Sequence, residues 1–566
     1  MKQTVTKALS IVAMAMLAPM IIVGIAKENQ SAKIARNLDI FNSLYKELNT
    51  YYVDTLDSEK SIETAINSML ANIDPYTEYI PANEREDFRV ISSGEYGGIG
   101  AMITQRGDTT YISEPYDGSP AARAGLLAGD AILVVNGDSV VGMSSDQVSS
   151  RLKGQPHSTI SVTVKRPYVG ADSIRTISFV REKIRVNPVP YYGVIRDNIG
   201  YINLSTYNEK SATRVKDALM AFKANGSVKS IVLDLRENGG GLLDQAVESV
   251  GFFVPKGTEV LQTRGRSVNN SRTYKTTHDP IDLTTPLFVL VDGYSASASE
   301  ITAGALQDLD RAVIVGSRSY GKGLVQTTRG LPFDATLKVT VAKYYIPSGR
   351  LIQAIDYSHR NTDGSVNRIP DSLTTVFHTA GGREVRDGGG ITPDVKIEPA
   401  QMTRLYYNIY RGLWAYDFSV KYHAQHPTLA SPEEFEVTDE LFSEFKKFID
   451  PKKFDYDKVC ETALGELRKI ANTEGYLNDS VKAQFDVLAK LLKHDLQHDL
   501  DINRKDISEL LTTELLTRYY YQSGAIIGQL KHDECIDKVS ELTNNPAEID
   551  KILGRQPQKP TQKKQK

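Results

Sequence analysis

The sequence has little cysteine, no excess of charge of either sign and no long apolar run after its first residues. Two cysteines, Cys460 and Cys535, are too few for a disulfide framework or a zinc site with four thiolates. Lysine and arginine number 67 against 70 for aspartate and glutamate, so the net charge is −3, which argues against general nucleic-acid binding. With 40% apolar and 24% charged residues, the chain is neither disordered nor collagen-like. Its 566 residues suggest about three to five domains.

One apolar run stands at the N-terminus. Lys2 and Lys7 precede an uncharged run from Ala8 to Ala26, which ends in small residues before polar residues resume. This pattern is typical of an export signal, and its length of about 19 residues also permits an uncleaved membrane anchor. We therefore expect residues 1–26 to be a signal peptide or membrane anchor. The bulk of the protein is then exported and periplasmic, either free or anchored by this segment.

Helical patterns are expected on both sides of the central part of the chain. In the predicted N-terminal helical region, 27–88, apolar residues recur at the spacing of one helix face: Phe41, Leu44, Tyr45, Leu48 and Tyr52. A second helix is expected at 61–72. Strand signals are absent from 401–554, which predicts a C-terminal helical domain. Residues 555–566 are rich in Gln, Pro and Lys and are expected to form a disordered basic tail.

Residues 89–170 contain a glycine-rich loop, a short helix, a strand, a longer helix and a second strand, in that order. The loop is Gly98-Ile99-Gly100-Ala101, and the strand at 129–137 ends in an Asn-Gly turn. The longer helix is expected at 145–152 and the last strand at 159–165. This order resembles a PDZ domain. Such a loop can offer backbone N–H groups to a terminal carboxylate, and an edge strand can pair with an extended tail.

Residues 171–400 alternate between strand and helix patterns. Strands are predicted at 199–204, 230–235, 287–292 and 311–315, and helices at 209–224, 242–253 and 297–308. This rhythm indicates an α/β layer with a partly parallel sheet. Farther on, Leu337, Val339 and Val341 alternate with less apolar residues, which predicts a strand with one buried face.

Two further motifs lack a required residue. Gly316 to Lys322 approaches the phosphate loop G-x4-G-K-[ST], but Gly323 stands where a hydroxyl residue would hold magnesium, and a strand rather than a helix is expected to follow. His494 and His498 have the i, i+4 spacing of metal ligands on a helix. Asp495 stands where a zincin has glutamate, and no third ligand is visible. We therefore expect no metal, nucleotide or other cofactor.

A string of serines at 293–300 lies where an apolar strand ends and a helix begins. Ser297 and Glu300 match the capping box S-x-x-E, which is a purely structural interpretation. The same geometry also suits catalysis, because a serine at a helix N-terminus lies beside unpaired N–H groups and the positive end of the helix dipole. The G-x-S-x-G elbow of the α/β-hydrolases is absent.

A nucleophilic serine needs a base. None of the histidines in the α/β segment has an obvious catalytic context: His278, His359 and His378. Lys322 lies after the next strand, between two glycines that permit close backbone approach. To act near neutral pH this lysine must lose its proton well below its usual pKa of about 10.4, which costs about 4 kcal/mol that burial can supply. The amide of Gln326 can hold the amine without adding charge.

Donors for a tetrahedral intermediate are expected in the glycine run at 234–241, which ends a strand and opens a helix. The N–H of Gly239 or Gly240, together with that of Ala298, would form an oxyanion hole. The alternative is a simple strand–helix turn.

Taken together, these pieces resemble the carboxy-terminal processing proteases, also called tail-specific proteases, over residues 35–400. The similarity rests on motifs in the family's order: Asp74-Pro75-Tyr76-Thr77, the PDZ unit, 233–240, 295–300, Gly321-Lys322-Gly323 with Gln326, 345–350 and 390–395. The resemblance implies a protease core of the ClpP or crotonase type. It also implies a Ser–Lys endopeptidase with Ser297 as nucleophile, Lys322 as base and Gln326 as its supporting residue.

The resemblance also implies partners. In this family the PDZ domain recognises substrate C-termini and gates the active site, so the expected substrates are proteins with unstructured C-terminal tails. An adaptor or regulatory protein and a homodimer through the N-terminal helices are further expected partners, and nucleic acid is not. The alternative is a PDZ scaffold that binds C-termini with little or no proteolysis. Neither the physiological substrate nor any pairing of Cys460 with Cys535 follows from the sequence.

Overall fold

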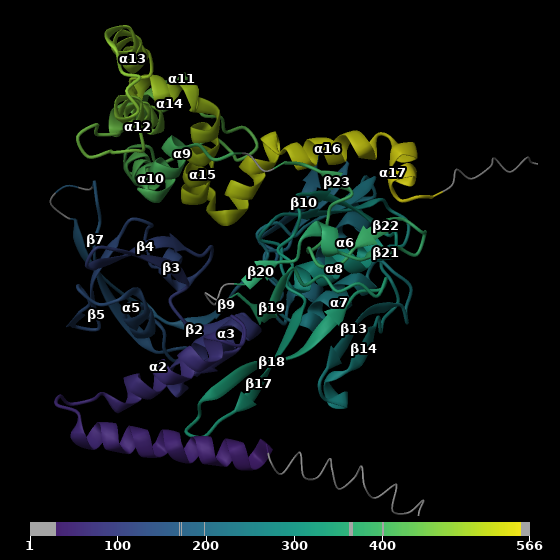
Figure 1. The fold of residues 1–566 in the computed structure, drawn as a ribbon. Coiled ribbons are helices and arrows are strands. Elements are labelled where there is room, and N and C mark those ends of the chain that lie inside the picture. Colours follow the sequence, from purple (N-terminus) through teal and green to yellow (C-terminus); the bar gives the residue numbers. More distant parts are fainter. Residues whose placement is uncertain are drawn as a thin grey trace, which may run out of the picture. The chain divides into compact units, whose positions relative to one another are not determined.

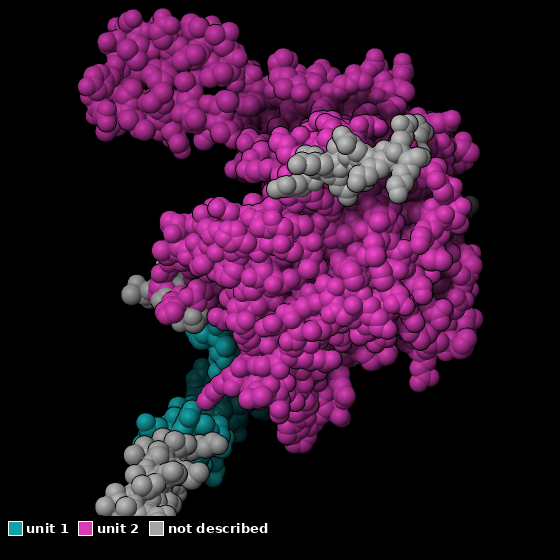
Figure 2. Space-filling model, turned by 90° about the vertical axis from the view of Figure 1, so that its right-hand side faces the viewer, with its two compact units in different colours: residues 1–79 teal, residues 80–566 magenta. Residues whose placement is uncertain are grey.

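The computed structural model describes residues 30–168, 170, 173–196, 198–361, 366–398 and 401–555. The chain divides into two compact units, residues 1–79 and 80–566 (Figure 2). The predicted export segment, 1–26, and all of the predicted tail except Arg555 lie outside the described residues. Within the described ranges, no helix is both long and apolar enough to cross a membrane.

The first unit is helical, as predicted. One helix spans residues 30–51, and α2 (Ser58–Ala71) follows it. The predicted apolar stripe of the first helix is largely exposed, with Leu44 at 59% and Leu48 at 42%. In the turn after α2, one oxygen of Asp74 accepts hydrogen bonds from the N–H groups of the second and third residues that follow it. Among the described residues, the stripe is therefore an exposed apolar surface.

A β-rich domain opens the second unit. After β1 (Glu78–Ile80) and α3 (Arg85–Ser93), β2 (Glu95–Gly98) pairs with β9 (Glu182–Arg185). Between β2 and β9 lies a sheet of order β3-β4-β5-β7-β8, to which β6 (Asp138–Ser139) adds beside β5. Its strands are β3 (Ala101–Arg106), β4 (Thr109–Pro115), β5 (Ala131–Val135), β7 (Thr159–Lys165) and β8 (Ile174–Val180). Two helices accompany it, α4 (Pro120–Arg123) and α5 (Ser145–Leu152).

The predicted elements of this domain are present. The longer helix and the last strand predicted for it are α5 and β7. Asn136 and Gly137 have φ values of 53° and 93°, as an Asn-Gly hairpin turn requires. The predicted PDZ range stops at residue 170, whereas the sheet continues through β8, which pairs with β7 along its whole length. The sequence between β7 and β8 carries a turn signal of the kind that also separates domains.

A six-stranded sheet forms the centre of the α/β domain. Its order is β10-β11-β12-β15-β16-β23, and β10 is its antiparallel member. The strands are β10 (Tyr191–Ile195), β11 (Ile199–Asn203), β12 (Ser230–Asp234), β15 (Leu287–Val291), β16 (Ala312–Gly316) and β23 (Val395–Lys396). The helices are α6 (Ser211–Asn225), α7 (Leu243–Gly251) and α8 (Ala298–Asp308). The strands β11, β12, β15 and β16 and the three helices are those predicted here, with ends shifted by at most two residues, whereas β10 and β23 were not predicted.

Successive residues of the central strands face opposite sides of the sheet, and both sides are covered. Leu233 and Val289 pack in one apolar cluster with residues of α6, α7 and α8. Val232 and Phe288 pack in a second cluster, together with α16 (Glu534–Thr543) and α17 (Pro546–Ile552). The last helices of the chain therefore cover the second face of this sheet, and in Figure 1 they lie beside β10 and β23. Burial on both faces explains why the strands are continuously apolar.

A second, antiparallel sheet carries a long hairpin. Its strands pair in the order β14-β13-β18-β17: β13 (Glu259–Gly265), β14 (Arg272–Lys275), β17 (Leu324–Gly330) and β18 (Thr336–Tyr345). The strand predicted around Leu337 is β18; Leu337 and Val339 are half-buried and lie on the same face as Ala342 and Tyr344, the fully buried residues of the strand. A bulge leaves Val341 without a partner between two consecutive residues of β17, and the extra residue reverses the alternation.

The helices after residue 403 form a bundle that also contacts the β-rich domain. They are α9 (Arg404–Arg411), α10 (Trp414–Gln425), α11 (Asp439–Phe448), α12 (Val459–Thr473), α13 (Asp479–Leu491), α14 (Leu496–Ile502) and α15 (Arg504–Gln529). Helix α15 is broken at Tyr521, where φ is 57°. Cys460 and Cys535 are both free; Cys535 is buried against the central sheet, which raises the pKa of its thiol to about 11.

Candidate active site

Ser297 stands in a strained turn between β15 and α8. It is the N-cap of α8 and has φ 57° and ψ −112°. A positive φ is uncommon outside glycine, costs about 1–3 kcal/mol and persists only where the surroundings fix it. The turn presents the serine at the carboxyl end of a parallel strand, where ligands bind in open α/β sheets.

The three serines of the 295–299 string differ in their surroundings. Ser295 donates from its hydroxyl to the carbonyl of Leu235 at 2.8 Å, and Ser299 donates to the carbonyl of Asn238 at 2.8 Å. Both side chains are completely buried, so these hydroxyls fasten the turn. Ser297, between them, is half-buried and lines a cavity. Only this middle serine is accessible to a substrate.

The cavity has a volume of about 580 Å³ and gathers residues that are far apart in the sequence. Gly239 and Gly240 come from the loop after β12, Ser297 from the turn before α8, Lys322 from the loop after β16, and Gln326 from β17. Of the residues predicted for catalysis and the oxyanion hole, all but Ala298 line it, and Ala298 is the next residue after Ser297. The strand expected after Lys322 is β17.

The buried carboxylate of Glu300 joins the serine turn to the lysine loop. One oxygen, Oε2, accepts from the N–H of Ser297 at 2.9 Å and from the N–H of Lys322 at 2.8 Å. The other, Oε1, accepts from the hydroxyl of Ser319 at 2.5 Å and from the N–H of Gly321 at 2.7 Å. Complete burial raises the pKa of Glu300 to about 7, while these four hydrogen bonds act in the opposite direction. The capping box was visible in the sequence, but the link to the lysine loop was not.

Two more side chains fix the surroundings of Lys322. The buried hydroxyl of Tyr344, on β18, lies 2.7 Å from the carbonyl oxygen of Lys322 and 3.2 Å from that of Ser297. The amide nitrogen of Gln326 donates to the hydroxyl of Thr340 at 3.1 Å. The amide oxygen of Gln326 is then the end that can accept from an amine. No sequence signal marked Tyr344 as part of the site.

The glycine turn after β12 lies directly against Ser297. Gly240 has φ 97°, and a Cβ placed on it would lie 2.8 Å from the Cβ of Ser297 and 2.9 Å from the nitrogen of Ala298. Its N–H donates to the side-chain oxygen of Asn238 at 2.9 Å. Within the described part of the chain, the N–H groups of Gly239 and Ala298 meet no acceptor. Of the predicted oxyanion donors, Gly239 and Ala298 are therefore the pair available to a ligand.

The predicted peptide-binding loop of the PDZ unit lies beside an open strand edge. The carbonyls of Ile99 and Gly100 accept from the N–H groups of Ala121 and Tyr116, each at 2.9 Å, while their own N–H groups meet no acceptor among the residues described. Gly100 has φ 73°, and a Cβ on it would lie 2.6 Å from that of Ser119. Strand β3, which Ala101 begins, ends the sheet, and α5 packs beside it.

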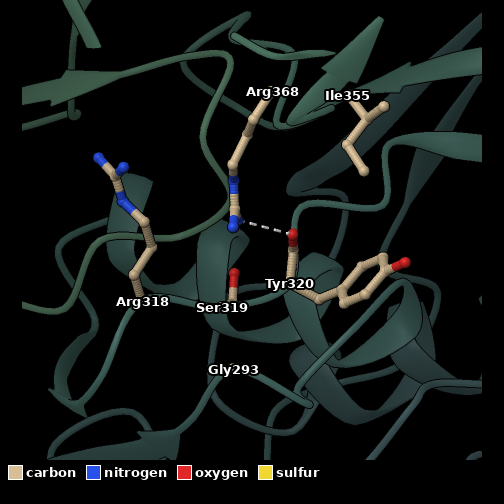
Figure 3. A pocket seen from close by; sticks show the side chains of 6 residues that line it. All are labelled: Gly293, Arg318, Ser319, Tyr320, Ile355 and Arg368. Atoms are coloured by element: carbon tan, nitrogen blue, oxygen red, sulfur yellow. Dashed lines mark hydrogen bonds between the residues drawn. The ribbon is translucent and has the colours of Figure 1, made fainter. Parts of the chain in front are cut away.

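A smaller cavity of about 150 Å³ lies nearby (Figure 3). Arg318, Tyr320 and Arg368 line it with Gly293, Ser319 and Ile355. Arg368 donates to the carbonyl of Tyr320 at 3.0 Å, and Arg318 pairs with Asp371 at 2.8 Å. Both arginines thus have protein partners, and none of the residues predicted for catalysis lines this cavity.

The histidines considered as metal ligands lie in the helical bundle. The ring of His494 contacts the carboxylate of Asp499 at 2.9 Å, and the N–H of His498 donates to Asp495 at the start of α14. In the part of the chain that the structure describes, no three or more His, Cys, Asp or Glu side chains are grouped so that they could hold a metal ion.

Comparisons with known proteins assign the chain to a family. The profile of peptidase family S41 matches residues 198–358, a PDZ-domain profile matches 111–166, and the profile "Probable PDZ-protease, C-terminal helical domain" matches 405–542. A carboxy-terminal-processing protease of Bartonella bacilliformis is 38% identical over 330 residues, which cover 58% of this chain and 75% of that protein. The chain belongs to the carboxy-terminal-processing proteases. Its predicted resemblance and its predicted fold class are both confirmed.

Two other relatives of this carboxy-terminal-processing protease are more distant. A probable CtpA-like serine protease of Staphylococcus aureus is 35% identical over 333 residues, 58% of this chain and 64% of that protein. Among solved structures, the photosystem II D1 C-terminal processing protease is 30% identical and covers 63% of this chain and 88% of its own, with a TM-score of 0.35.

Proposed function

We propose that this carboxy-terminal-processing protease is an exported serine endopeptidase that captures unstructured C-terminal tails and cleaves them by a Ser–Lys mechanism. One observation carries the proposal. Ser297, on a strained turn, lines the same cavity as Lys322 and Gln326, and one buried carboxylate holds the backbones of the serine and the lysine. If Ser297 served only to cap α8, it would need neither its strained backbone nor its position on the wall of the cavity.

The reaction runs through an acyl-enzyme. The neutral amine of Lys322 takes the proton of Ser297 as its oxygen attacks the scissile carbonyl. The resulting oxyanion accepts from the N–H groups of Ala298 and Gly239. The C–N bond breaks as the lysine returns its proton to the leaving amine. Water, deprotonated by the same lysine, then hydrolyses the ester, and the proton goes back to Ser297.

The proposed mechanism requires the neutral form of Lys322. The side chain is half-buried, and loss of water disfavours the ammonium. Gln326 offers an amide oxygen, which can orient the amine without a full negative charge. A carboxylate in its place would stabilise the ammonium and raise the pKa of the lysine.

Tail capture is assigned to the PDZ domain. The N–H groups of Ile99 and Gly100 suit a terminal carboxylate, and the free edge of β3 suits an extended tail that adds as a strand. The apolar pattern at 1–26 supports export. The exposed stripe on the helix at 30–51 supports a homodimer, and an adaptor protein remains a further proposed partner.

The experiment compares the purified protein with its Ser297→Ala variant on an unstructured substrate that ends in an apolar residue, with and without a C-terminal amide. The proposal expects cleavage by the wild type alone, with a higher KM for the amidated substrate. If neither protein cleaves but both bind the free tail, the chain is a PDZ scaffold. Equal cleavage by both proteins would remove Ser297 from the mechanism, and equal KM values would remove tail recognition.

A further inference from the structure

Helix α16 lies along β12 and is hydrogen-bonded near both ends of that strand. At its start, Asp533 forms an ion pair with Arg236, two residues after β12 ends, at 2.6 Å. At its end, the hydroxyl of Thr543 is 2.7 Å from that of Ser230, the first residue of β12. The helix therefore runs antiparallel to the strand that leads into the glycine turn.

The contact at Asp533 is divided between its two oxygens. Oδ1 accepts from the N–H groups of Cys535 and Ile536, at 2.9 and 3.1 Å, and so caps α16. Among the residues that the structure describes, Oδ2 accepts only from Arg236, at 2.6 Å. Capping of the helix and pairing with the arginine can thus be altered separately.

Arg236 is held from two sides and stands directly before the turn. Its guanidinium also donates to both oxygens of Asp234, at 2.6 to 3.1 Å, and its backbone N–H donates to the same carboxylate at 3.0 Å. The next residue, Glu237, has φ 60°, and its N–H donates to Asp292 at 3.1 Å. Gly239 follows two residues later. Because a left-handed residue is strained, the turn keeps its shape only through such contacts on either side.

We propose that Asp533 is a positioning residue of the peptidase: it fixes Arg236 and, through it, the turn that aims the N–H of Gly239 at the oxyanion. The inference rests on the proposed function, because it assigns the role of Gly239 in that mechanism. Through Asp533, the C-terminal helices would then help to position the oxyanion hole of the protease core.

The negative charge of Asp533 would slow the reaction, whereas its proposed positioning of the turn would speed it. Because the two effects have opposite signs, the inference can be tested. Removing a negative charge near a developing oxyanion would, by the field alone, help the reaction. A slower reaction without Asp533 therefore reports on the position of the turn and not on the field.

The test variant is Asp533→Ser, which keeps a good N-cap oxygen but cannot reach Arg236. The matched control is Asp537→Asn, on the same helix, whose partner Arg196 lies in the turn between β10 and β11 at 2.7 Å. Both are compared with the wild type for melting temperature, kcat, KM and inhibition by a peptide aldehyde and by an uncleavable peptide. The aldehyde forms an oxyanion on the serine, whereas the uncleavable peptide does not.

For Asp533→Ser we expect kcat to fall about tenfold with KM changed less than twofold. Aldehyde binding should weaken by a similar factor, while binding of the uncleavable peptide stays the same. Asp537→Asn should leave kcat, KM and the binding of both inhibitors unchanged. If Asp533→Ser does not fold, Asp533→Asn, which also keeps the cap oxygen, replaces it.

Wild-type kcat in the folded Asp533 variant, or equal losses in the Asp537 control, would overturn the inference. A wild type whose activity survives Ser297→Ala would instead refute the proposed mechanism, so the two failures are distinguishable.

Discussion

Glu300 shows how much of the site depends on single buried residues. Its carboxylate accepts four hydrogen bonds from two loops, and no solvent reaches it. Replacing one of its oxygens by an amide nitrogen would leave at least one of these buried donors unpaired, at a cost of about 1–3 kcal/mol. Glu300 is therefore expected to govern both stability and the alignment of Ser297 with Lys322.

The Glu300→Gln variant should be less stable and show a flatter dependence of stability on pH. Burial raises the pKa of Glu300 from 4.5 to about 7, so the folded state holds the proton more tightly than the unfolded state. Its contribution to stability is then full below pH 4.5 and is lost as the pH rises to about 7. Between pH 5 and 8 the wild type should lose about 2 to 3 kcal/mol more than the variant in urea unfolding. Equal losses of unfolding free energy in the wild type and the variant would contradict the raised pKa of Glu300.

Gly240 permits a test of the contact between the glycine turn and Ser297. A methyl group there would lie within 3 Å of Ser297 and of Ala298, on a backbone with φ 97°, so the turn must move. The Gly240→Ala variant should lose at least about tenfold in kcat, roughly 1.4 kcal/mol or more. Gly293→Ala is the control, since a Cβ there meets no atom within 4 Å. If both variants cleave substrate at the wild-type rate, the glycine turn does not constrain Ser297.

At the scale of elements, the central strands and the helices α6 to α8 followed from the sequence, because long apolar runs between turn residues are informative. The change of the buried face of β18 from odd-numbered to even-numbered residues at Val341 did not follow, because the bulge there depends on pairing with β17. The helical character of 401–554 followed from the sequence, but the packing of α16 on the central sheet did not, since a helix packs equally well on a bundle or a sheet. Ser319 and Tyr344 were missed for a related reason, because tertiary contacts alone bring them to the site.

Loss of packing between α16 and the central sheet should destabilise the protease core. Ile536 is completely buried against that sheet. Ile536→Ala should lower the free energy of unfolding by about 2–4 kcal/mol. Ile470→Ala, on α12, removes the same atoms from a side chain that is 53% exposed and should cost well under 1 kcal/mol. Similar urea midpoints for the two variants would show that α16 does not belong to the core.

At the scale of the molecule, the helical bundle contacts the PDZ domain through polar side chains and through Val420, which lies against Gly129. Arg518, on α15, donates to the carbonyl of Ala128 at 2.5 Å, and Tyr416, on α10, donates to that of Ile112 at 2.9 Å. The guanidinium groups of Arg518 and Arg106 lie over the Tyr416 ring, at 5.0 and 4.9 Å from its centroid.

Arg518→Ala should loosen this contact. Amide hydrogen exchange in β4 and β5 of the PDZ domain should become faster, while exchange in β12 and β15 stays unchanged. Arg504→Ala is the control on the same helix, since that side chain pairs with Asp439 and lies over Phe442. Unaltered exchange of the PDZ strands in the Arg518 variant would show that the contact does not restrain the domain.

The most direct test of the account is to identify the acylated residue. The protein is mixed briefly with a slowly hydrolysed peptide ester, quenched in acid, and digested for mass spectrometry, alongside the Ser297→Ala and Lys322→Met variants. We predict one acyl adduct on the peptide containing Ser297, absent from Ser297→Ala and formed at least a hundredfold more slowly in Lys322→Met. An adduct on any other residue, or one formed at the wild-type rate without the lysine, would contradict the Ser–Lys mechanism.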